Sequence, residues 1–146
     1  MFASILVAID DSACAQRALA IALDLALVHN AKLTVATVVD PVEACAPALD
    51  PYSAIVPFLE ALTENAHRLI DEATVKAIAA GVPADGAVLE GPPVATLLEL
   101  ARRDRVDLIV IGSHGRRGVA RFVAGSVAEG VTREAPCPTL IVHDIT

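Results

Sequence analysis

The sequence is short of cysteine, of basic residues and of long hydrophobic runs, and each shortage excludes a class of protein. The three cysteines are scattered and odd in number, so no disulfide framework is expected and a reducing cytoplasm is the expected location. Lys and Arg number 11 against 18 Asp and Glu, and the net charge of -7 argues against general DNA or RNA binding. No apolar stretch approaches the roughly 18 to 20 residues of a membrane span, and the N-terminus reaches Asp10 and Asp11 without the basic leader of a signal peptide.

Several kinds of site are excluded by residues that the sequence lacks at particular positions. The histidines have no metal-ligand spacing with one another or with cysteine, so no zinc site is expected; they are His29, His67, His114 and His143. No Gly-Lys pair occurs, which rules out the P-loop of kinases and ATPases. A dinucleotide-binding domain would place glycines after the first strand, where Asp10-Asp11-Ser12 has none. Cys14 and Cys137 have no catalytic partner identifiable in the sequence and are expected to be small core residues.

Apolar strands alternate with amphipathic helices along the whole chain. The predicted strands cover residues 4–9, 33–39, 87–89, 108–111 and 139–143. The predicted helices follow Asp10-Asp11-Ser12, run from Phe58 to Gly81, open at Pro92-Pro93, and include 126–135. Strands that alternate with helices cannot pair as hairpins, and their crossovers are right-handed. The pattern therefore predicts an α/β fold in a single domain, 1–146, with one doubly wound five-stranded parallel sheet and helices on both faces.

Three local features carry further expectations. Residues 40–57 contain four prolines and no sustained period, which predicts a long mobile loop suited to cover a site. Asp11 is expected to cap the first helix, since capping needs only one acceptor. Gly130 lies inside the last predicted helix, where glycine costs about 1 kcal/mol relative to alanine, so this helix is expected to be loosened.

Two glycine segments after the fourth strand suit phosphate. Gly112-Ser113-His114-Gly115 follows the strand, and Gly125-Ser126 stands at a predicted helix start. Ligands of open parallel sheets bind outside the carboxyl ends of the strands. Glycines let backbone N–H groups converge, and a helix N-terminus adds about half a positive charge. Three arginines between the segments add a local positive field: Arg116, Arg117 and Arg121.

The spacing of these glycines resembles a known motif. Gly112, Gly115, Gly125 and Ser126 form G-x2-G-x9-G-[ST], which resembles the nucleotide-binding motif of the universal stress protein family, in its ATP-binding subgroup. The resemblance extends over the chain, through ILVAIDDS, VVDP and GSVAEGVTREAPCPTLIV. It implies the strand order 3-2-1-4-5 of a flavodoxin-like fold, a homodimer, and ATP, with or without Mg²⁺, bound across the strand ends.

The resemblance also implies roles for single residues. Asp10 would contact the ribose or adenine side, and Val38 would face the adenine with its backbone, with Ala8 in the same nucleotide-binding set. The residues implied to line the phosphates are Gly112, His114, Gly115 and Arg116, and those implied to hold the terminal phosphates are Gly125, Ser126 and Val127. Ala128 stands where some members carry another hydroxyl, which removes one phosphate or metal contact.

Two functions remain open at this stage. The first is a homodimeric signalling or chaperoning module of the stress response that responds to an adenine nucleotide and acts on an unknown protein partner. The second is a slow ATP hydrolase or phosphate-transfer enzyme at the same site. A hydrolase needs a group that positions water beside the terminal phosphate, and residues 112–126 contain no Asp or Glu, which favours the binding module. His114, Arg117 and Arg121 fit equally well as solvated loop residues.

The last strand predicts how the dimer forms. In the implied order it lies at an edge of the sheet, and its sequence TLIV has no Lys, Pro or inward charge to discourage pairing. Two copies meeting antiparallel about a two-fold axis would bury Leu140 or Val142 against the partner.

Overall fold

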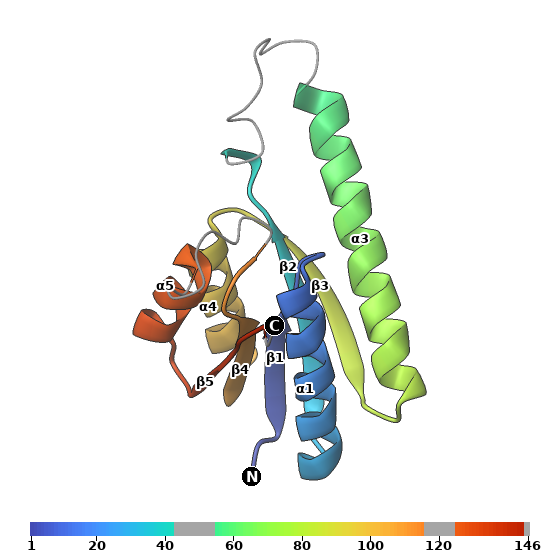
Figure 1. The fold of residues 1–146 in the computed structure, drawn as a ribbon, viewed down its shortest axis with the longest axis vertical. Helices are drawn as coiled ribbons and strands as arrows, with labels where there is room; N and C mark the ends of the chain where they lie inside the picture. Colours follow the sequence, from blue (N-terminus) through green and yellow to red (C-terminus); the bar gives the residue numbers. More distant parts are fainter. Residues whose placement is uncertain (43–54, 116–124, 145–146) are drawn as a thin grey trace.

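The protein is described by a computed structural model that covers residues 1–42, 55–115 and 125–144. Its elements alternate in the predicted order: β1 (Ser4–Ala8), α1 (Ala13–His29), β2 (Lys32–Val39), α3 (Ile55–Ala79), β3 (Ala84–Glu90), α4 (Pro93–Arg103), β4 (Leu108–Gly112), α5 (Ser126–Glu134) and β5 (Thr139–Val142). The five strands form one parallel sheet in the order β3-β2-β1-β4-β5 (Figure 1). The predicted fold class is confirmed.

Helices cover both faces of the sheet, which explains why the central strands are unbroken apolar runs. Successive side chains of a strand point to opposite faces. α1 and α3 cover one face of the sheet, and α4 and α5 cover the other (Figure 1). Ile5 and Val7 belong to the hydrophobic cluster beneath α1 and α3, and Leu6 and Ile109 belong to the cluster beneath α4 and α5. β1 and β4 therefore contribute side chains to the hydrophobic clusters on both faces of the sheet.

The cap of α1 is Ser12 and not Asp11. Ser12 has an extended backbone directly before the helix, and its Oγ accepts a hydrogen bond from Ala15 N at 3.2 Å. The prediction for Asp11 was wrong because the residue whose side chain reaches the first-turn N–H groups is the one immediately before the helix. Gly81 follows the end of α3 with φ +87°, as expected of a glycine that ends a helix.

Two elements begin three residues earlier than predicted, and the other strands differ from their predicted bounds by one residue. α3 begins at Ile55 rather than Phe58, because Pro57 falls in the first turn, where its missing N–H has no intrahelical partner to lose. Residues 43–54 of the predicted loop lie outside the described residues, so its mobility stays a prediction. β3 covers Ala84–Glu90 rather than 87–89, because Asp85 and Gly86, which have low strand propensity, pair with β2.

Gly130 has a packing role in α5. A Cβ at this position would lie 2.7 Å from Val94 Cγ2 of α4, and Gly130 is buried. The prediction of a loosened helix rested on the helix propensity of glycine alone and did not include this contact with α4. The missing side chain lets α4 and α5 approach each other closely, so the low helix propensity of glycine is offset by packing.

Gly130→Ala is therefore expected to destabilise the protein by about 1 to 3 kcal/mol, although alanine is the better helix former, because the added methyl overpacks the α4–α5 contact. Urea unfolding measures this change. Adding Val94→Ala should recover most of the loss, whereas Glu129→Ala on the exposed side of α5 serves as the neutral control. A stabilised Gly130→Ala protein would contradict the packing role.

Candidate functional site

The candidate site lies where the sheet reverses its order. From β1 the chain moves to β2 and β3 on one side, and later to β4 and β5 on the other. The carboxyl ends of β1 and β4 are therefore the topological switch point, where ligands of this architecture bind. Ala8 lies opposite Ile111 in the register of these two strands, so the residues that follow each strand leave the sheet side by side.

Asp10 and Gly115 contact each other across this point. A Cβ at Gly115 would lie 2.7 Å from Asp10 Oδ2, so the glycine leaves room for the carboxylate. Asp10 Oδ1 accepts a hydrogen bond from Ser12 N at 2.9 Å, which orients the group. A carboxylate accepts hydrogen bonds from hydroxyl groups and repels phosphate. This position suits a ribose hydroxyl better than a phosphate.

The start of α5 is bonded to the same turn. Gly125 N donates to Ser113 O at 2.6 Å, and a Cβ at Gly125 would lie 3.3 Å from that oxygen. Gly125 is the N-cap residue of α5 and provides no side-chain cap. The N–H groups of Ser126 and Val127 thus stand at an N-terminus with a positive partial charge, beside the glycine turn. The Ser126 side chain is exposed, where its hydroxyl can reach an anion.

Ser113 is a buried residue of the site that the sequence analysis did not single out. Its side chain is 0% exposed, and its Oγ lies 3.0 Å from His114 Nδ1 and 3.7 Å from Cys14 Sγ. Ser113 N donates to Val142 O at 2.8 Å, and the same carbonyl accepts from Cys14 Sγ at 3.0 Å. The hydroxyl therefore fixes the orientation of the His114 ring. A serine beside Gly112 was visible in the sequence, but its burial depends on α1 and β5, which are distant along the chain.

Ala8 and Val38 lie on the side predicted for adenosine. Both are half-buried and pack against the hydrophobic cluster beneath α4 and α5. Ile9 N donates to Ala36 O at 2.8 Å, so the carbonyls of even-numbered β2 residues point toward β1. The carbonyl of Val38 follows this direction beyond Ala8, the last β1 residue in the register. Its position suits an edge-on contact with a planar ring.

The remaining predicted site residues are Gly112, Val127 and the three arginines. A Cβ at Gly112 would lie 3.1 Å from Cys14 Sγ and 3.3 Å from Ala15 N, so this glycine admits the start of α1. Val127 is half-buried against the same cluster as Val38, which leaves its backbone N–H as the group suited to phosphate. Arg116, Arg117 and Arg121 lie outside the described residues, and their predicted contacts stay predictions.

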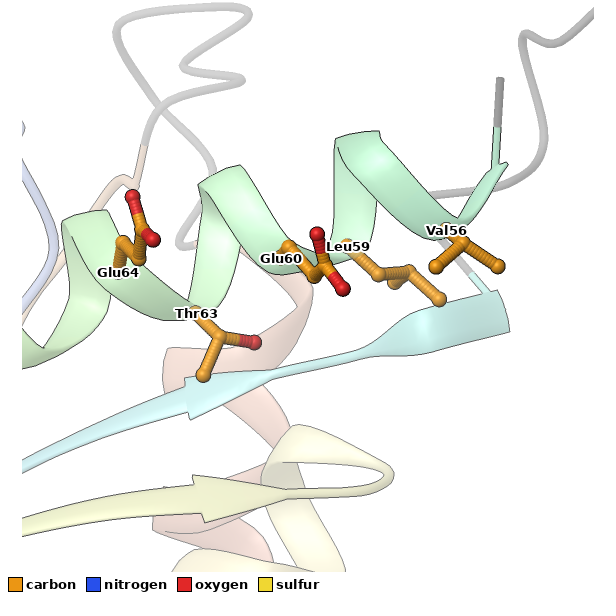
Figure 2. Close-up of a pocket in the computed structure, with 5 residues that line it drawn as sticks. All are labelled: Val56, Leu59, Glu60, Thr63 and Glu64. Atoms are coloured by element: carbon orange, nitrogen blue, oxygen red, sulfur yellow. The ribbon is translucent and has the colours of Figure 1, made fainter. Parts of the chain in front are cut away.

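A separate hollow lies along the first half of α3. It has a volume of ≈ 380 Å³, and Figure 2 shows Val56, Leu59 and Thr63 projecting toward the chain that leaves β2. Glu60 and Glu64 line the same hollow. Their carboxylates repel phosphate, so the glycine turn is the better candidate for an anionic ligand.

The described ranges contain neither a metal-binding cluster nor a membrane-spanning helix. No group of three or more His, Cys, Asp or Glu side chains within them is arranged to hold a metal ion. None of their helices combines the length and apolar composition needed to cross a membrane.

Comparison with known proteins gives a family match. A sequence model of the universal stress protein family matches residues 1–143. The chain belongs to the universal stress protein family. A Thermus aquaticus relative, named universal stress protein in QAH/OAS sulfhydrylase 3'region, is 35% identical over 145 residues, which cover 98% of this chain and 100% of the relative.

Solved structures of universal stress proteins have the same fold. The protein UspA from Lactobacillus plantarum superimposes with a TM-score of 0.84 at 29% identity, over 97% of both chains. A universal stress protein solved in complex with cAMP superimposes with a TM-score of 0.72 at 30% identity, also over 97% of both chains. The adenine nucleotide is a ligand of that protein.

The two glycines of the turn in this universal stress protein are expected to respond differently to a methyl group. Gly112→Ala should cost about 1 to 3 kcal/mol of unfolding free energy, because the backbone of α1 cannot move away easily. Gly115→Ala should change it by less than about 0.5 kcal/mol, because only the end of the Asp10 side chain has to rotate. Urea unfolding of the two variants measures the difference, and equal losses would show that the turn is uniformly packed.

Proposed function

We propose that this protein binds an adenine nucleotide, with ATP as the expected ligand, across the carboxyl ends of β1 and β4. One observation carries the proposal: Asp10 contacts Gly115 while Gly125 N bonds to Ser113 O. An acceptor suited to ribose and an N-terminus suited to phosphate thus lie at one edge of the sheet. The spacing of Gly112, Gly115, Gly125 and Ser126 and the family relative that binds cAMP support the same ligand class.

The ligand orientation follows from the charges at the two ends. Phosphates would lie at the N-terminus of α5, against the N–H groups of Ser126 and Val127 and the Ser126 hydroxyl. The ribose would lie at Asp10 and the adenine near Val38 and Ala8. Mg²⁺ would arrive on the phosphates, since this ion keeps several waters and is usually held by substrate phosphates with few protein ligands.

We favour binding over catalysis. Residues 112–126 supply no carboxylate to position a water molecule beside the terminal phosphate. The Nδ1 atom of His114 is engaged with Ser113 Oγ, which fixes the ring. A protein that holds ATP without turning it over rapidly can report the nucleotide state through its conformation, and membership of the family supports our proposal of a regulatory role in the stress response.

Isothermal titration with Mg-ATP should detect binding to the native protein, and Ser126→Ala should weaken it roughly tenfold to a hundredfold. The reason is that a hydrogen bond to a charged group contributes about 1.5 to 3 kcal/mol. Adenosine, which lacks phosphate, should bind both proteins equally.

Thr132→Ala is the matched control, because its hydroxyl donates to Ala128 O at 2.7 Å within the same helix. Folded native protein that gives no heat with any adenine nucleotide would overturn the proposal. Equal weakening of ATP and adenosine by Ser126→Ala would remove Ser126 from the phosphate site.

The second part of the proposal is a dimer through β5. Ile109 N donates to Pro138 O and Ser113 N donates to Val142 O, so the even-numbered residues bond to β4. The backbone groups of Ile141 therefore face away from the sheet. Val142 is already buried in its own chain, whereas Leu140 is 37% exposed. Leu140 is thus the side chain left for a partner.

Ile141→Pro should convert the dimer to a monomer, because it removes an outward N–H and leaves the bonds to β4 intact. Light scattering should give twice the 15.1 kDa chain mass for the native protein and the single mass for the variant. Val88→Pro, at the opposite edge of the sheet, should leave the dimer intact. A native monomer at micromolar concentration would contradict this part of the proposal.

A further inference from the structure

The second edge of the sheet, formed by β3, presents unused backbone groups. Leu33 N donates to Pro83 O at 2.8 Å, and Gly91 N donates to Val39 O at 3.0 Å, so the odd-numbered residues bond to β2. Because successive residues of a strand alternate, the N–H and C=O groups of Gly86 and Val88 point away from the sheet. Exposed edges are usually protected by lysine, proline or a bulge, and residues 86–89 are Gly-Ala-Val-Leu.

α3 overhangs this edge and forms a wall beside it. A Cβ at Gly86 would collide with Ile70 Cγ2 and lie 2.8 Å from Thr74 Oγ1, so the helix rests directly on the strand there. A groove of ≈ 500 Å³ follows the junction. Its lining residues are His67, Ile70, Asp71, Thr74, Val75, Gly86 and Val88. Val75 is 66% exposed, so part of the apolar wall faces solvent.

A hydroxyl in the groove lacks a partner. Thr74 Oγ1 is buried, and it makes no hydrogen bond to any residue in the described ranges. Buried polar side-chain atoms are bonded in the large majority of cases, so an unbonded one calls for an explanation. This unbonded hydroxyl lies against Gly86 at the junction of α3 and β3, which forms the inner wall of the groove.

The charges beside the groove select the occupant. Asp71 lines the groove, and the exposed Glu90 ends the strand. The carboxylate of Asp85 is paired with Lys32, which raises the pKa of that lysine through their hydrogen bond. The two remaining carboxylates favour a partner with positive side chains.

We propose that the outer edge of β3 and the overhanging side of α3 form a docking groove for an extended peptide segment of a partner protein, in which every second residue faces the groove and these residues include both apolar and basic ones. The backbone of the segment would bond to Gly86 and Val88 as a sixth strand. Apolar side chains would lie against Val75 and Val88, and a Lys or Arg would pair with Asp71. Extended peptides bind sheet edges in this way, with backbone bonds giving affinity and alternate side chains giving specificity.

The probe is a phage-displayed library of short linear peptides, selected against the full-length protein. Enriched peptides should carry Lys or Arg two or four residues away from Val, Ile or Leu, so that both kinds of side chain face the groove. Asp71→Lys should lower the affinity for a synthetic peptide of an enriched sequence about tenfold or more. The reason is that the substitution replaces the carboxylate that pairs with the Lys or Arg of the peptide by a positive charge. Glu72→Lys is the matched control, because it makes the same charge change one residue away and outside the groove, and it should leave the affinity within about twofold.

Amide exchange by NMR gives a readout specific to strand addition. The outward amides of Gly86 and Val88 should exchange faster than those of Ala87 and Leu89 in the free protein and become protected when the peptide binds. Val88→Pro should abolish binding while Ile141→Pro preserves it. The proposal is overturned if no peptide is enriched, or if Asp71→Lys and Glu72→Lys bind equally. It is also overturned if the outward amides are protected in the free protein by a second copy of the chain. None of these results depends on ATP binding.

Discussion

Two backbone hydrogen bonds of Ser113 hold the candidate site together. Its N–H bonds to Val142 O, at the end of β5, and its carbonyl accepts from Gly125 N, at the start of α5. The turn after β4 is thus tied to the last strand and to the last helix by one residue. With its hydroxyl buried beside His114 and Cys14, Ser113 cannot be replaced by a larger side chain without moving both of these residues.

Glycines at this site act as spacers for other parts of the chain. Gly112 makes room for the start of α1, Gly115 for the Asp10 carboxylate, and Gly130 for Val94 of α4. Only the space beside Gly115 opens onto the candidate site; those beside Gly112 and Gly130 are filled by helix packing. The motif spacing is therefore partly a requirement of helix packing, and this explains why a pattern associated with nucleotide binding includes a residue whose free side faces α1.

The fold was predictable because strand and helix signals alternate cleanly and each strand is bounded by turn residues. The motif residues were predictable as a set because their spacing is local. What the sequence could not show are contacts between distant segments. The burial of Ser113 requires Cys14 and Val142, and the place of Gly130 in packing requires Val94. β3 was predicted too short because Asp85 and Gly86 have low strand propensity, which pairing with β2 overrides.

The order β3-β2-β1-β4-β5 leaves the two open edges at opposite ends of the sheet, so each molecule has two separate edges at which another strand can pair. Such a sheet can propagate head to tail, because pairing β3 of one copy with β5 of the next does not close on itself. The two edges are poorly matched for this: β3 has seven residues and carries Asp85 and Glu90, whereas β5 has four. This mismatch favours a closed pair at β5 over an open-ended filament, and β3 would stay accessible in the dimer proposed above.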